Sequence, residues 1–100
     1  MVKHVILWKL KDEYSGIEIK KIKQGIKDGL EGLSGKIPGL IDIKVNMEPL
    51  ESSNCDLMLD STFEDYESLK GYSTHPLHVD IATTKVRPYT SSRTCMDYEA

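Results

Sequence analysis

Residues 63–79 read Phe63-Glu64-Asp65-Tyr66-Glu67-Ser68-Leu69-Lys70-Gly71-Tyr72-Ser73-Thr74-His75-Pro76-Leu77-His78-Val79, and two helix starts lie within this stretch. Asp65 follows a strand-like run and is a residue type that caps helices. Tyr66, Leu69 and Tyr72 follow it at steps of three residues, which is the spacing of one helical face. The first start therefore predicts a helix that begins after Asp65 and packs through this face.

The second start is at Pro76, which suits the first position of a helix because no N–H is needed there. Thr74 or His75 would then cap the helix. Three apolar side chains are expected to pack beneath it: Leu77, Ile81 and Val86. A helix broken in this way between two strands would bring Tyr72, His75 and His78 close together, and this corner is the candidate site.

The chain opens with a strand pattern over residues 1–11, in which side chains alternate between two faces. One face has the character of a core: His4, Ile6, Trp8 and Leu10. The other face has Val5 and Leu7 at its centre, with lysines on either side. Strands that are apolar on both faces are normally covered on both faces. The pattern therefore indicates that a partner covers the second face.

A surface helix is predicted to start at Ser15 and to end near Gly32 to Gly35, because apolar residues recur there at steps of three or four. This stripe comprises Ile19, Ile22, Ile26, Leu30 and Leu33. The helix starts with the capping-box form Ser15-Gly16-Ile17-Glu18. Gly25 and Gly29 within it indicate either close packing on the sheet or a weak helix.

Alternating residues predict three further strands, over residues 41–47, 55–63 and 92–98. In the first of them the inward side chains would be Ile41, Ile43, Val45 and Met47. The order strand, helix, strand, strand, broken helix, strand is that of the ferredoxin-like fold, βαββαβ. We therefore predict an α+β protein with a four-stranded antiparallel sheet, helices on one face, and a single domain over residues 1–100.

The composition, 39% hydrophobic and 29% charged, is that of an ordinary soluble domain. A net charge of −3 does not indicate the basic surface that nucleic-acid-binding proteins present. No apolar run approaches the ~20 residues that span a bilayer, and no signal-peptide layout is present. Cys55 and Cys95 would lie about two strand spacings apart, ~9–10 Å, beyond the reach of a disulfide. We expect a reduced, cytoplasmic protein without nucleic-acid or membrane partners.

Four sequence elements follow one another along the chain: Val2-Lys3-His4-Val5, then Asp56-Leu57-Met58-Leu59 leading into Phe63-Glu64, then Tyr72 with Thr74-His75-Pro76-Leu77-His78-Val79, and finally Asp97-Tyr98. Together they resemble the stress-responsive A/B barrel (Dabb) family over nearly the whole chain. The resemblance implies a dimeric α/β barrel, in which two such sheets face each other, so the expected partner is a second copy of the chain. The residues expected to meet that copy are Val5, Leu7, Met58, Thr94, Met96 and Tyr98.

The family includes a plant polyketide cyclase with a histidine base and a tyrosine in a cavity between sheet and helices. By motif position the resemblance implies that His78 is this base, that Tyr72 is its partner, and that His4 is a further cavity histidine. A histidine can take a proton beside a carbonyl, while a tyrosine hydroxyl holds the carbonyl oxygen. This chain departs from the cyclase because Leu57 replaces another histidine and Trp8 would narrow the pocket. The expected binding residues are His4, Ile6, Trp8, Leu57, Leu59 and His75.

Other interpretations of the histidines stay open. His4 and His78 can be core residues, each satisfied by a backbone carbonyl or by Tyr72. His75 is better explained as a cap before Pro76 than as a catalyst. A metal bound through His75 and His78 would need a third ligand from elsewhere, so we expect no metal and no cofactor.

Arg93 shares its strand face with Cys95 and is expected to extend along the edge of the sheet. Otherwise it would lie near the cleft and favour an anionic ligand. Three functions remain: a protein that binds a small apolar molecule, which we favour, an enzyme with a histidine base, and a structural stress-response protein without catalysis. Both ligand hypotheses fail if Trp8 and its neighbours fill the cleft completely.

Overall fold

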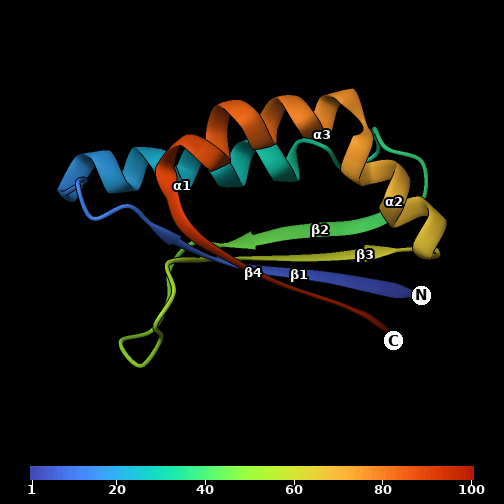
Figure 1. The fold of residues 1–100 in the computed structure, drawn as a ribbon, viewed down its shortest axis with the longest axis horizontal. Helices are drawn as coiled ribbons and strands as arrows, with labels where there is room; N and C mark the ends of the chain where they lie inside the picture. Colours follow the sequence, from blue (N-terminus) through green and yellow to red (C-terminus); the bar gives the residue numbers. More distant parts are fainter.

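The computed structural model describes residues 1–100 and has all its helices on one face of a single sheet (Figure 1). The strands are β1 (Val2–Leu10), β2 (Leu40–Asn46), β3 (Leu57–Phe63) and β4 (Thr90–Glu99). The helices are α1 (Gly16–Glu31), α2 (Tyr66–Thr74) and α3 (Pro76–Ile81), followed by a π-helical turn, η1 (Ala82–Val86), and a 3-10 turn, η2 (Arg87–Tyr89). None of the helices has both the length and the apolar character that crossing a membrane requires.

The strands lie in the order β2-β3-β1-β4, and every neighbouring pair is antiparallel. This order and the helices on one face confirm the predicted ferredoxin-like α+β fold. β3 and β1 are the two inner strands, and β4 lies at the edge of the sheet beside β1. His4 pairs with Asp97 across β1 and β4, and Trp8 pairs with Arg93. Residues from the two ends of the chain therefore lie side by side beneath the helices.

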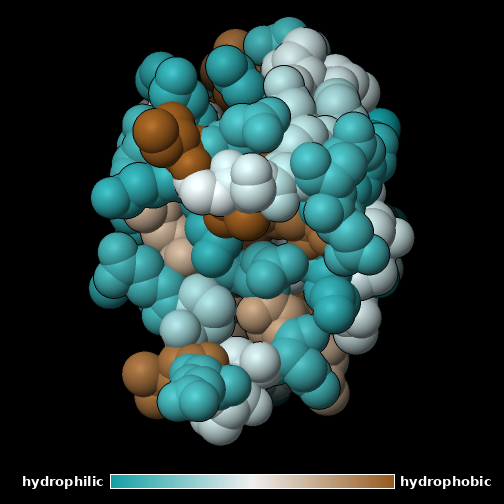
Figure 2. All heavy atoms as spheres, turned by 90° about the vertical axis from the view of Figure 1, so that its left-hand side faces the viewer, coloured by the Kyte–Doolittle hydropathy of each residue, from teal (hydrophilic) through white to brown (hydrophobic).

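The core lies between the sheet and its helices and contains sixteen buried hydrophobic residues. Its largest fully buried members are Tyr72, Phe63, Ile26, Leu30, Leu57 and Leu59. The end of the molecule at which α1 begins presents mostly hydrophilic side chains, with hydrophobic atoms in the seam between helices and sheet (Figure 2). A site between the two layers is therefore bordered by the packed side chains of the core.

The alternation in β1 predicts the two faces of the sheet correctly. The core-type residues His4, Ile6, Trp8 and Leu10 are all buried beneath the helices. No helix covers the opposite face, which leaves apolar side chains open: Leu7 is 37% exposed, Met96 66% and Tyr98 43%. This helix-free face is the surface that the sequence assigns to a partner.

The two helices of the broken segment begin where their caps predict. Asp65 accepts a hydrogen bond from the backbone N–H of Ser68 at 2.8 Å. The His75 side chain accepts one from the N–H of Leu77 at 3.2 Å, and Pro76 stands in the first turn of α3. Each cap satisfies a backbone donor that the helix itself cannot pair.

Two residues of this segment are more exposed than their spacing predicts. Tyr66 is 56% exposed because steps of three residues drift by about 60° around a helix. It therefore leaves the face through which Leu69 and Tyr72 are buried. Leu77 is 45% exposed and lies in the first turn of α3, whereas α3 meets α1 through Ile81 near its other end.

Two features of α1 differ from the sequence prediction. Ser15 occupies the cap position but its side chain makes no capping hydrogen bond, so the capping box does not form. A Cβ on Gly29 would lie 3.0 Å from Cγ2 of Ile81, whereas one on Gly25 would meet nothing within 4 Å. The close packing that Gly29 indicates is therefore against α3 and not against the sheet.

Ile41 is 46% exposed, although its place in the alternating run predicts an inward side chain. The register between β2 and β3 shifts between Leu40 and Asp42. An irregularity of this kind adds a residue to one strand and turns its side chain out of the pattern. Ile43 and Val45, which follow the shift, are buried as predicted.

Candidate functional site

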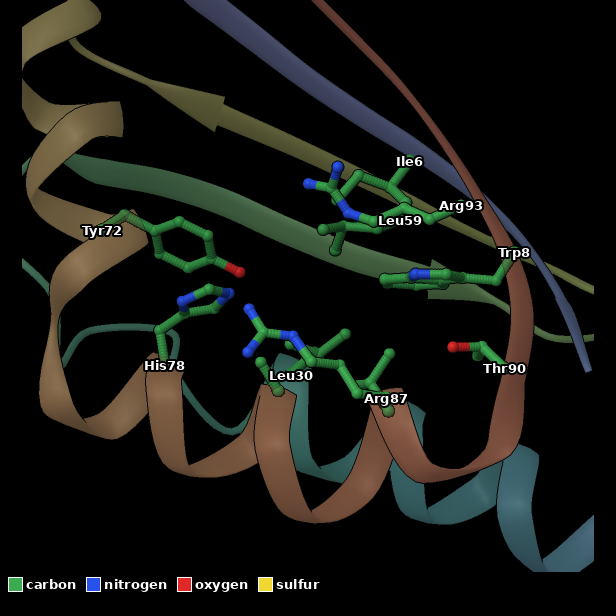
Figure 3. Close-up of a pocket in the computed structure, with 11 residues that line it drawn as sticks. Ile6, Trp8, Leu30, Leu59, Tyr72, His78, Arg87, Thr90 and Arg93 are labelled. Atoms are coloured by element: carbon green, nitrogen blue, oxygen red, sulfur yellow. The ribbon is translucent and has the colours of Figure 1, made fainter.

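A cavity of about 350 Å³ lies between the sheet and the helices. The strands β1, β3 and β4 bound it on one side, and the three helices with the turns η1 and η2 bound it on the other (Figure 3). Its lining is Ile6, Trp8, Leu30, Leu59, Tyr72, His78, Ala82, Val86, Arg87, Thr90 and Arg93. Trp8 lines this space without filling it. The two hypotheses that require a ligand, binding and catalysis, therefore both remain possible.

Tyr72 and His78 lie together at one end of the cavity. Their ring centroids are 4.2 Å apart and the ring planes are inclined by 38°. The break between α2 and α3 creates this contact, because Pro76 starts a new helix that carries His78 back beneath the Tyr72 ring. Figure 3 shows the Tyr72 hydroxyl pointing into the cavity beside the imidazole.

Burial sets the protonation state of both rings. Burial raises the pKa of the Tyr72 hydroxyl, which therefore stays protonated and able to donate at neutral pH. Burial lowers the pKa of His78, and the positive charges of Arg87 and Arg93 lower it further. The imidazole is therefore neutral at pH 7 and able to accept a proton.

The hydroxyl of Tyr72 is fully buried, yet no protein group forms a hydrogen bond with it. Buried polar atoms in proteins nearly always have a partner, and an unpaired one costs about 1–3 kcal/mol. An oxygen atom of a ligand in the cavity would accept this hydrogen bond. With the neutral imidazole beside it, the same donor can hold a carbonyl oxygen while His78 takes a proton from the adjacent carbon.

His4 lies behind the cavity and does not line it, contrary to the prediction. Its ring stands edge-on to Tyr72, with centroids 6.0 Å apart. Its Nδ1–H donates to the carboxylate of Asp97 at 2.5 Å, which draws the imidazole toward β4. The hydroxyl of Ser61 donates to the His4 carbonyl at 2.8 Å. His4 is therefore a packing neighbour of Tyr72 whose orientation Asp97 sets.

Three possible metal ligands lie around this histidine. The donor atoms of His4, Cys95 and Asp97 are within 4.8 Å of one another. Hydrogen bonding accounts for the grouping, because the Cys95 thiol also donates to Asp97, at 3.5 Å. Burial, with the hydrogen bond and charge of Asp97, raises the pKa of the Cys95 thiol. A metal binds the thiolate form, whereas these three residues form a hydrogen-bonded group around a protonated thiol.

Only part of the predicted binding set lines the cavity: Ile6, Trp8 and Leu59. Leu57 belongs to the predicted set but is packed into the core, where it is 1% exposed. His75 also belongs to that set, but it lies in a separate shallow hollow beside Ile37 and Pro38. Its side chain is held at the start of α3 by the capping hydrogen bond, so it does not join Tyr72 and His78.

Three polar residues line the cavity in addition to the predicted binding set: Arg87, Thr90 and Arg93. Arg93 follows the second of its two predicted placements, since it lines the cavity rather than the sheet edge. Its pairing with Trp8 across β1 and β4 places both on the helix-covered face. The direction of Arg87 cannot be predicted from α-helical spacing, because it follows a π-helical turn, η1, and begins a 3-10 turn, η2.

Comparison with known proteins places the chain among relatives of the same fold. The family model described as the stress responsive A/B barrel domain (Dabb) matches residues 2–100. No curated protein matches the chain.

Among solved structures, a dimeric protein of unknown function with a ferredoxin-like fold from Bacteroides fragilis is 32% identical, with a TM-score of 0.90 over 99% of this chain and 95% of that chain. A protein from Arabidopsis thaliana is 26% identical, with a TM-score of 0.75 over 100% of this chain and 95% of that chain. A hydroxynitrile lyase from Passiflora edulis is 16% identical, with a TM-score of 0.71 over 97% of this chain and 90% of that chain, and it shares the fold alone.

Proposed function

The chain belongs to the stress-responsive A/B barrel (Dabb) family, and from this premise we propose that it is a homodimer that binds a small, mostly apolar molecule between its sheet and its helices. The observation that carries the proposal is the unpaired Tyr72 hydroxyl at the wall of an apolar cavity. Ligand pockets typically combine apolar walls with a few convergent polar groups. Trp8 and Leu59 supply apolar surface here, and Tyr72 supplies the donor.

The homodimer is supported by the helix-free face of the sheet. Leu7, Met96 and Tyr98 are exposed there, and an apolar patch of this kind on a protein surface marks an interaction site. The Bacteroides fragilis structure is described as dimeric. Two sheets that face each other would bury these side chains from both copies, at about 25 cal/mol per Å² of apolar surface.

Ligand binding can be tested through Trp8, because it is the only tryptophan of the chain and it lines the cavity. Octanamide is a suitable neutral probe, since its amide oxygen can accept from Tyr72 while its alkyl chain occupies the apolar space. We expect octanamide to cause a saturable change in tryptophan emission. Ala82→Phe, which places a ring in the cavity, should abolish the change, whereas Leu77→Phe on the neighbouring helix should preserve it.

Circular dichroism of each variant separates a blocked cavity from a misfolded chain. A change that rises linearly with octanamide, or that survives in a folded Ala82→Phe variant, would show that the probe does not occupy this cavity. Either result would refute the ligand-binding proposal.

The dimer is tested separately by light scattering after size-exclusion chromatography. We expect a mass of twice the 11.3 kDa of one chain. Met96→Asp places a charge on the helix-free face and should shift the mass toward the monomer. Leu50→Asp is a matched control, because Leu50 is 78% exposed and lies outside the sheet. A monomeric wild-type protein at micromolar concentration would refute the homodimer.

A second candidate function, an enzyme acting on a carbonyl compound, is favoured by the pairing of Tyr72 with a neutral His78. His78 would remove a proton from the carbon next to the carbonyl while Tyr72 holds its oxygen. The test follows deuterium incorporation beside the carbonyl of 2-octanone in D2O by NMR. Exchange should be faster with the wild-type protein than with His78→Gln. Equal rates in the two folded proteins would exclude His78 as the base.

A further inference from the structure

Two arginines line the cavity from opposite layers of the molecule. Arg87 comes from η2 on the helix side, and Arg93 comes from β4 on the sheet side. Figure 3 shows the Arg87 guanidinium directed toward Tyr72 and His78, and the Arg93 guanidinium directed along the sheet toward the same end of the cavity. Both arginines are exposed residues, so the part of the cavity that they line is in contact with solvent.

Neither guanidinium has a counter-charge in the protein. The ion pairs of the chain involve other cations, and no acidic residue lines the cavity. The carboxylate of Asp97, which shares the strand face of Arg93, is bonded to His4. The chain has 16 acidic and 13 basic residues. Two unpaired cations in the lining of one cavity are therefore not a consequence of the overall charge.

The positive charges of the two arginines act on the titratable groups inside the site. Arg87 and Arg93 both lower the pKa of His78, and Arg93 acts against the burial that raises the pKa of Tyr72. Their fields therefore reach the end of the cavity where the Tyr72 hydroxyl has no partner. Three donors converge on this end: two planar guanidinium groups and one phenol.

This arrangement suits one kind of ligand group. A guanidinium presents two parallel N–H bonds that match the two oxygens of a carboxylate. A phenol hydroxyl can donate to either of those oxygens. The remaining wall toward Trp8 and Leu59 is mostly apolar and has no charged group, and Thr90 beside Trp8 adds one uncharged hydroxyl.

We propose that the ligand of this cavity is an amphipathic carboxylate, held at its charged end by Arg87, Arg93 and Tyr72, with its apolar part directed toward Trp8. This inference rests on the proposed ligand-binding function and specifies the chemical class of the ligand. The arginines select the charged group, and the apolar walls accept a chain or ring of suitable size.

Octanoate and octanamide provide the test, because they have nearly the same shape and differ in charge. We expect octanoate to bind the wild-type protein about tenfold more tightly than octanamide, measured by Trp8 emission at low salt. In Arg87→Gln and Arg93→Gln the preference should fall, and in the double variant it should vanish. The affinity for octanamide should stay unchanged in all three.

Lys85→Gln is the matched control, because it removes the same charge from η1 at a position that does not line the cavity. It should leave the preference for octanoate intact. Equal binding of the two probes by the wild-type protein would overturn this inference while leaving the proposed function standing. Arginine variants that weaken both probes equally would also overturn it, because the arginines would then act on the fold. Binding of neither probe would refute the proposed function itself.

Discussion

Tyr72→Phe should stabilise the protein without ligand and weaken its binding of ligand. The substitution removes only the buried hydroxyl, which has no hydrogen-bonding partner. The ring itself stays in place and is 1% exposed. Its centroid lies 5.0 Å from that of Phe63 and 4.2 Å from that of His78. An unpaired buried hydroxyl costs about 1–3 kcal/mol. We expect the free energy of unfolding to rise by about 1 kcal/mol, which corresponds to about 4–8 °C in Tm for a domain of this size.

The assay is urea unfolding followed by circular dichroism at one fixed protein concentration, because dimerisation makes apparent stability depend on concentration. Tyr66→Phe is the control, since Tyr66 lies on the same helix with 56% exposure and its hydroxyl is in water. It should change stability by less than about 0.5 kcal/mol.

The same Tyr72→Phe variant should bind octanamide about tenfold more weakly, because the amide oxygen loses its donor. Two results would refute the reasoning. A loss of stability of 1 kcal/mol or more in Tyr72→Phe would mean that the hydroxyl has a partner in the folded protein. Unchanged octanamide affinity would mean that the hydroxyl does not meet the ligand.

Further predictions concern α1 and the pH dependence of stability. Gly25→Ala should raise the free energy of unfolding by about 0.5–1 kcal/mol, because alanine is the better helix former and its Cβ meets open space. Gly29→Ala should gain less, since its Cβ would press on Ile81 at 3.0 Å, and equal gains in urea unfolding would show that Ile81 moves aside freely. Since burial lowers the pKa of His78 from 6.5, the unfolded chain takes up the proton first on acidification. Stability should therefore fall as pH drops below 6.5 and level off once the lowered pKa is passed, whereas His78→Gln should lose this part of the profile in urea unfolding at several pH values.

The sequence predicted those parts of the fold that depend on neighbouring residues. The alternation around Ile6 assigned the two faces of β1, and the caps Asp65 and His75 marked the start of each short helix, because capping is a matter of residues two or three positions apart. Tyr72 and His78 are separated by one such helix break, so the sequence was also sufficient to predict that the two side chains lie close together.

Long-range geometry limited the prediction of the site. Arg93 lines the cavity because β4 lies against β1 and presents the same face as Trp8. His75 was misplaced because its cap holds the side chain outside the cavity. Ile41 was misplaced because a shift in the register with β3 cannot be read from an alternating pattern.

The π-helical turn η1 has a consequence for how the rim of the cavity can vary. An α-helix rotates by about 100° for each residue, and a π-helical turn holds roughly one residue more than an α-helical turn. The extra residue between Ala82 and Val86 therefore swings everything that follows, beginning with Arg87, around the helix axis. Deleting one residue such as Thr84 would restore regular α-helical winding and turn the Arg87 guanidinium away from the cavity. The length of a single turn is therefore enough to add a cation to the cavity lining or remove one, while the sheet stays the same.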